Sequence, residues 1–73
     1  MALDLSTNPA AIAQSKCALA YVLAQQASGE LIAAVAMPAH VLPVIRGNLE
    51  RTRDACREAT AALDSLLEAM EGG

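Results

Sequence analysis

The sequence predicts an all-α protein, an antiparallel helical hairpin that pairs into a four-helix bundle. Three observations lead to this fold class. Alanine is the commonest apolar residue, and there is one Tyr but no Phe or Trp, whereas strands favour aromatic and β-branched residues. Two prolines, Pro38 and Pro43, interrupt the helical pattern near the middle of the chain. The apolar residues after them repeat at alternating intervals of four and three, the period of a coiled coil.

The N-terminal half begins with a helix-start signal. Residues 1–8 have no apolar periodicity, and we expect them to be disordered. The Asn8 side chain suits the capping of free backbone N–H groups, and Pro9 suits the first helical position, where its missing donor costs nothing. The first helix is predicted over residues 9–37. It has a candidate break at residues 28–29, because glycine tolerates the left-handed conformation that ends helices.

The two prolines place the turn of the hairpin. A residue before proline is pushed away from the helical region, so a turn is predicted at residues 38–42 and a second helix at residues 43–70. Together they make a single domain over residues 9–71. A domain this small sits close to the limit of stability and usually needs a staple, a metal or a partner.

The second helix carries the strongest pattern in the chain. Its apolar seam consists of Ile45, Leu49, Thr52, Cys56, Ala59, Leu63, Leu66 and Met70. The first helix differs because it is apolar nearly all round, and such a helix is normally buried. One partner helix cannot cover all of its apolar surface. This mismatch predicts association, with a second copy as the simplest partner and another helical protein as the alternative.

The first helix has two apolar stripes, and each needs an assignment. We expect the bulky stripe of Ile12, Leu19, Val22 and Leu23 to pack within the hairpin against Ile45, Leu49, Cys56, Leu63 and Leu66. The small-residue seam would then form the interface with the second chain. That seam consists of Ala10, Ala13, Cys17, Ala20, Ala24 and Ala27. The reverse assignment stays open, because the pattern alone does not say which stripe faces inward.

The charges of the second helix are segregated. Its arginines lie in the first part and its acids crowd the end, where they oppose the helix macrodipole. The candidate charged contacts are Arg46, Arg53, Arg57, Asp64 and Glu68. One hypothesis is that the acidic end meets the arginine stretch of a partner helix that runs the other way, centred near Ala59. The alternative is a solvated face with pairs such as Arg46–Glu50 and Asp54–Arg57, each of minor energetic value.

No residue pattern points to catalysis, a metal or a cofactor. The chain has one histidine and two distant cysteines, whereas a Cys/His metal site needs closely spaced ligand pairs. His40 is expected to be exposed in the turn. Cys17 and Cys56 are expected to be small buried residues, and a disulfide between them is the alternative. We therefore expect no enzymatic activity.

The function predicted from the sequence is a non-enzymatic protein–protein interaction module, a homodimeric hairpin acting as adaptor, co-chaperone or regulator. The alternative is a nucleic-acid-binding regulator using the arginine stripe, but the net charge of −3 and a pI near 4.8 argue against it. A membrane partner is disfavoured because the apolar stretch 31–45 contains two prolines and is too short to span a bilayer. The first residues lack a secretory pattern, so a cytoplasmic location is expected.

Overall fold

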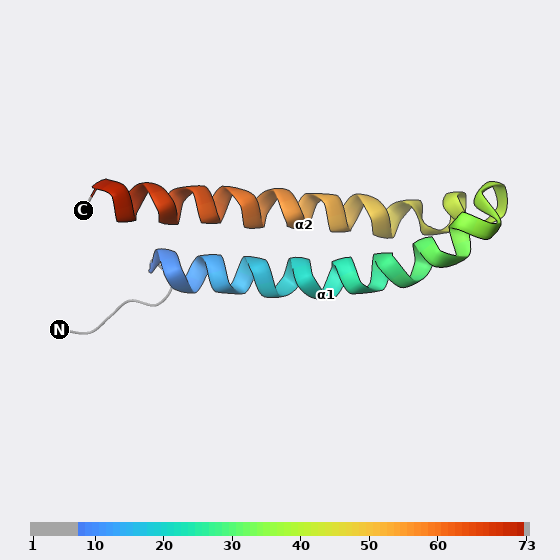
Figure 1. The fold of residues 1–73 in the computed structure, drawn as a ribbon, viewed down its shortest axis with the longest axis horizontal. Helices are drawn as coiled ribbons and strands as arrows, with labels where there is room; N and C mark the ends of the chain where they lie inside the picture. Colours follow the sequence, from blue (N-terminus) through green and yellow to red (C-terminus); the bar gives the residue numbers. More distant parts are fainter. Residues whose placement is uncertain (1–7, 73) are drawn as a thin grey trace.

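A computed structural model describes residues 8–72, which form two long helices packed side by side in antiparallel directions (Figure 1). α1 spans Pro9–Ala36 and α2 spans Pro38–Gly72, and the described residues contain no strand. The prediction of an all-α helical hairpin is confirmed. The expectation of disorder at the N-terminus was for residues 1–8; residues 1–7 lie outside the described residues, and Asn8 is placed as the N-cap of α1.

α1 begins where the capping signal places it. Asn8 is extended, and its side-chain oxygen accepts hydrogen bonds from the backbone N–H groups of Ala10 (2.9 Å) and Ala11 (3.4 Å). Pro9 occupies the first helical position. The candidate break at residues 28–29 does not occur, and α1 runs through Gly29 without a positive φ. One helical glycine costs about 1 kcal/mol, and the alanines buried on either side of it hold the helix against α2.

The turn is shorter than the sequence predicts. A single residue, Met37, separates the helices, whereas the prediction was a turn at residues 38–42 with the second helix starting at residue 43. Met37 takes a non-helical conformation because it precedes Pro38, and Pro38 is tolerated as the first residue of α2. Pro43 lies inside α2, where it removes one backbone hydrogen bond. Figure 1 shows the first turns of α2 departing from the axis of its long straight part.

The two helices meet along small residues. The buried positions of α1 recur every seven residues and are all alanine: Ala13, Ala20, Ala27 and Ala34. On α2 the buried residues are Ile45, Ala55 and Ala59. Ala20 packs with Ala55 and Ala59 at the centre of this core, and Cys17 and Leu23 pack against them. Small side chains on both sides let the helix axes come close together.

Three polar contacts between the helices fix their register. Lys16 Nζ lies 3.6 Å from a carboxylate oxygen of Glu58. The Asn48 side chain donates to a carboxylate oxygen of Glu30 at 3.0 Å. The Thr52 hydroxyl lies 3.3 Å from the Leu23 carbonyl oxygen of α1 and 2.8 Å from the Asn48 carbonyl oxygen of its own helix. Residues near Cys17 are therefore level with residues near Ala59.

The bulky stripe of α1 faces outward, opposite to its first assignment. Ile12, Leu19 and Val22 are exposed in the hairpin, and only Leu23 is half-buried. The reverse assignment holds in part: Ala13, Ala20 and Ala27 of the small-residue seam are buried, Cys17 is half-buried, and Ala10 and Ala24 are exposed. Alanines facing inward allow a closer helix–helix approach than leucines and valines would, and they do so along the whole of α1 because their row continues to Ala34.

Only part of the predicted apolar seam of α2 packs against α1. Ile45 and Ala59 are buried, and Leu49, Thr52 and Leu66 are half-buried, but Cys56 and Leu63 are exposed. Ala55 takes the inward place predicted for Cys56. Of the two rows of the seam, the one with Ile45, Thr52, Ala59 and Leu66 faces α1 along its whole length, and the one with Cys56 and Leu63 lies toward the solvent.

Candidate interaction surface

Each helix has an apolar row at intervals of seven residues that faces into the hairpin, and a second such row, which we call the unused row, that is mostly exposed. On α1 the inward row starts at Ala13, and the unused row is Ala10, Cys17, Ala24 and Leu31. On α2 the inward row is Ile45, Thr52, Ala59 and Leu66, and the unused row is Leu49, Cys56, Leu63 and Met70. Leu31, Leu63 and Met70 are among the exposed large apolar side chains.

The two unused rows lie on the same side of the hairpin, which we call the uncharged face. A groove on this side is lined by Ala24, Ala27, Ser28, Leu31, Ile32 and Val35 from α1 and by Thr52 from α2. Thr52 stands between Leu49 and Cys56 on α2, and Cys17 precedes Ala24 by one seven-residue interval on α1. None of the residues in the groove or in the two rows is charged.

The opposite side of the hairpin, which we call the charged face, carries both charged residues of α1 and four of those of α2. Its groove is lined by Leu19, Leu23, Gly47, Glu50, Arg51, Asp54, Ala55 and Glu58. The charged residues of α1, Lys16 and Glu30, both lie on this side, where they contact Glu58 and Asn48 of α2. The hairpin therefore has one face suited to water and one suited to a partner.

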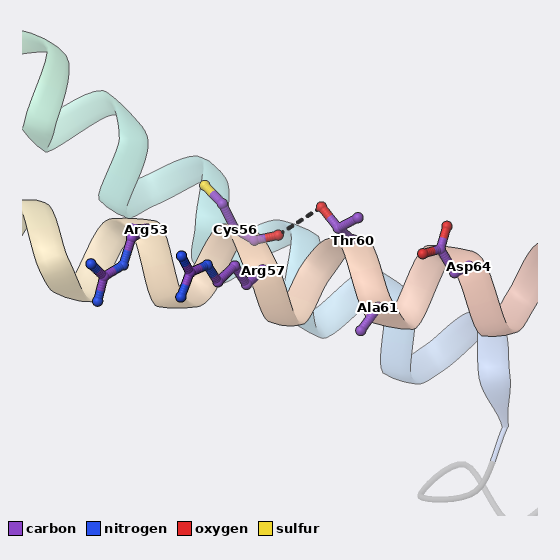
Figure 2. Close-up of a pocket in the computed structure, with 6 residues that line it drawn as sticks. All are labelled: Arg53, Cys56, Arg57, Thr60, Ala61 and Asp64. Atoms are coloured by element: carbon purple, nitrogen blue, oxygen red, sulfur yellow. Dashed lines mark hydrogen bonds between the residues drawn. The ribbon is translucent and has the colours of Figure 1, made fainter.

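A second groove, the α2 groove, runs beside the unused row of α2 (Figure 2). Figure 2 shows two rows of side chains with a spacing of four residues: Cys56, Thr60 and Asp64 along one edge, and Arg53, Arg57 and Ala61 along the other. The Thr60 hydroxyl donates to the Cys56 carbonyl oxygen at 2.9 Å. Small side chains line the middle of the groove, arginines lie at one end, and the Asp64 carboxylate lies at the other.

The candidate charged contacts divide into paired and unpaired residues. Arg46 Nε lies 2.9 Å from Glu50, and Arg53 donates through Nε and Nη2 to Asp54, both at 3.1 Å. Within residues 8–72, none of the ion pairs includes Arg57, Asp64 or Glu68. Asp54 pairs with Arg53, not with Arg57 as in the predicted solvated face. Exposed pairs of this kind are weak, so the arginines are available to other acids.

The cysteines and the histidine form no combined site. Cys17 is half-buried and Cys56 is exposed, and both are free thiols in the structure. His40 lies exposed near the start of α2. No group of three metal-binding side chains occurs among the residues that the structure describes. The described surface therefore offers contact area and charge.

α1 also has the composition of a membrane-spanning helix. Its most apolar 18-residue window has a mean hydropathy of 1.2, and 17% of that window is buried. Mostly buried core helices of soluble proteins, and signal sequences near the N-terminus, have the same length and composition. From the sequence, a membrane span was considered only at residues 31–45. The low burial of this window means that the hairpin by itself leaves an apolar helix largely uncovered.

Part of this surface differs from the prediction. Of the six small residues of α1 predicted at the interface, Ala13, Ala20 and Ala27 are instead buried against α2. Leu31, Ile32 and Val35 were not predicted there, although the absence of charged residues between Glu30 and Arg46 was a signal for them. Comparison of the chain with protein-family models, curated proteins and solved structures finds no significant match.

Proposed function

We propose that this chain is a non-enzymatic protein–protein interaction module that pairs with a second copy of itself through the uncharged face. One observation carries the proposal: each helix has an apolar seven-residue row that is mostly exposed in the hairpin, and both rows lie on the same uncharged side. A contiguous apolar surface on a small soluble protein usually marks an interaction site. The role of adaptor, co-chaperone or regulator belongs to the same proposal.

Energetics support a partner. The buried residues of the hairpin are six alanines and Ile45, and an alanine side chain removes little apolar area from water. For a chain of this size, apolar burial and conformational entropy nearly cancel. The larger apolar side chains of both helices contribute little until something covers them, since burying a Leu or Ile side chain is worth about 1.5–3 kcal/mol. A second hairpin supplies that cover.

The geometry of the two faces favours a second copy over a lipid surface. Two hairpins stacked through their uncharged faces make a four-helix bundle, in which Lys16, Glu30 and Glu58 remain in water. Interfacial membrane helices usually carry Lys and Arg along their polar side, whereas the charged face here mixes both signs. A two-fold dimer also uses the same patch on both copies, which a small chain with one such face can provide.

A matched pair of leucine substitutions tests the proposal. Leu63 lies on the uncharged face and is 42% exposed, and Leu19 lies on the charged face and is 49% exposed. Leu63→Lys is expected to shift the protein from a dimer toward a 7.5 kDa monomer, because it buries a charge in the interface. Leu19→Lys is expected to leave the dimer intact. The measurement is light scattering after size exclusion, with reductant present.

Each outcome of this experiment has a clear meaning. Monomeric Leu63→Lys with dimeric Leu19→Lys supports the proposal. The reverse result assigns the interface to the bulky stripe and overturns the role of the uncharged face. A wild-type chain that is a folded monomer at high concentration overturns self-association altogether, and the uncharged face would then be a site for a different protein.

A further inference from the structure

We propose that the two copies pair about a two-fold axis perpendicular to the helices, at the level of Cys17 and Ala59, with α2 against α2 of the second copy in antiparallel directions. The inference rests on the proposed self-association and specifies its register and partner residues. It is carried by three independent patterns that one axis position satisfies: the row on α2, the row on α1, and the charges of the α2 groove.

The unused row of α2 is centred close to this level. Cys56 precedes Ala59 by three residues and Leu63 follows it by four, so an axis at this level brings Cys56 opposite Leu63 of the second copy. Leu49 and Met70 precede and follow Ala59 by ten and eleven residues, and they meet in the same way. The apolar residues of the row thus cover one another in pairs.

Part of the unused row of α1 fits the same axis. Ala10, Cys17 and Ala24 are evenly spaced about Cys17, so Ala10 faces Ala24 of the second copy and the two Cys17 side chains face each other, whereas Leu31 lies beyond these pairs. Cys17 packs against the buried cluster that contains Ala59, which places the two residues at the same level in the hairpin. The axis that pairs the row on α2 therefore also pairs these three members of the row on α1.

The charges select the antiparallel direction. Arg53 lies six residues before Ala59 and Asp64 lies five after it, about 9 Å and 7.5 Å along the helix axis. Two-fold pairing brings Arg53 against Asp64 of the second copy, and Arg46 against Glu71 of the second copy in the same way. The small residues in the middle of the α2 groove, Cys56, Thr60 and Ala61, allow this close approach (Figure 2).

This pairing also accounts for the acidic end of α2. Asp64, Glu68 and Glu71 oppose the macrodipole of their own helix, the last turn has no basic residue, and among the described residues Asp64 and Glu68 have no cationic partner. In the dimer they lie beside the arginine stretch of the second copy. Arg53 exchanges its exposed pair with the adjacent Asp54 for a partner across the interface.

Charge reversal in two separate chains tests the pairing. Arg53→Glu alone places two acids opposite each other, and Asp64→Lys alone places two cations opposite each other, at two symmetric points in each dimer. Each variant is expected to self-associate roughly tenfold or more weakly than the wild type. An equimolar mixture is expected to form a heterodimer with wild-type affinity, because both contacts become attractive again. Arg51→Glu, which makes the same charge change on the charged face, is the matched control and is expected to dimerise normally.

The mixture separates this inference from the proposed function. Residues 53 and 64 are about 16 Å apart along one helix, so recovery on mixing has no explanation within a single chain. Recovery, measured by sedimentation equilibrium with helicity verified by circular dichroism, supports the register. Normal dimers from both single variants overturn the register and leave self-association standing. A monomeric wild type overturns both.

A thiol measurement gives an answer that does not depend on the charged variants. Cys56→Ser keeps the thiol of Cys17, and mild oxidation is expected to join two such chains, with two protons and two electrons passing to the added oxidant. Cys17→Ser keeps the thiol of Cys56, which lies about 9 Å along the axis from its counterpart, and is expected to stay uncrosslinked. Covalent dimers from Cys17→Ser, with none from Cys56→Ser, overturn the axis position.

Discussion

The alanine row inside the hairpin gives the most direct test of how its two helices pack. Ala20 is 8% exposed and lies against Ala55 and Ala59. Ala20→Leu adds three carbon atoms where two small side chains already meet, so the helix axes must separate or the side chain must adopt a strained rotamer. Such overpacking costs about 1–3 kcal/mol. The same change at exposed Ala18 is the control, because Leu and Ala have similar helix propensities.

The assay is thermal unfolding followed by circular dichroism, with all variants at one protein concentration because dimerisation makes Tm concentration-dependent. For a domain of this size, each kcal/mol shifts Tm by about 4–8 °C. Ala20→Leu is therefore expected to lower Tm by about 4–20 °C, and Ala18→Leu by no more than a few degrees. Equal behaviour of the two variants would refute the inward placement of the alanine row and favour packing through the bulky stripe.

The remaining stability predictions concern Ile45, Gly29 and Asn8, each measured by urea unfolding. Ile45→Ala removes the one large buried side chain among residues 8–72, which is 5% exposed, and is expected to cost about 2–5 kcal/mol. Val44→Ala, at an 80% exposed site, is expected to change stability by about 0.5 kcal/mol or less. Similar losses at both sites would contradict the assigned burial. Gly29→Ala is expected to stabilise the fold by about 0.5–1 kcal/mol, because the backbone is helical there and the added Cβ meets no atom within 4 Å. A loss of stability in this variant would show that α1 breaks at this glycine. Asn8→Ala is expected to lower stability by about 1 kcal/mol because it removes the N-cap, whereas Asn8→Ser is expected to keep most of the stability that the cap contributes. Equal losses in the two variants would speak against capping.

The sequence was sufficient for the fold class and for the start of α1. Capping by Asn8 and the fixed φ of Pro9 are local effects, so they can be read without knowing what the helix packs against. The turn was harder to place, because Pro38 is compatible both with a break and with the first position of a helix. Met37 alone leaves the helical conformation, and Pro43 is accommodated within α2.

Periodicity alone could not predict which apolar row of each helix faces the other helix. A row of alanines and a row of bulky residues on α1 both have helical spacing, and they differ only in how closely they let α2 approach. The length of the alanine row was an overlooked signal, since it continues to Ala34 while the assigned bulky stripe ends at Leu23. On α2, periodicity likewise did not decide between Ala55 and Cys56, which are adjacent in the sequence and both small.

The central claim is that this hairpin is half of a symmetric four-helix bundle. Sedimentation equilibrium of the wild-type chain, with reductant and over a wide concentration range, tests it most directly. The account predicts a helical species with twice the 7.5 kDa mass of the chain, which dissociates only at the lowest concentrations. A helical species that keeps the mass of a single chain at the highest concentration would contradict it.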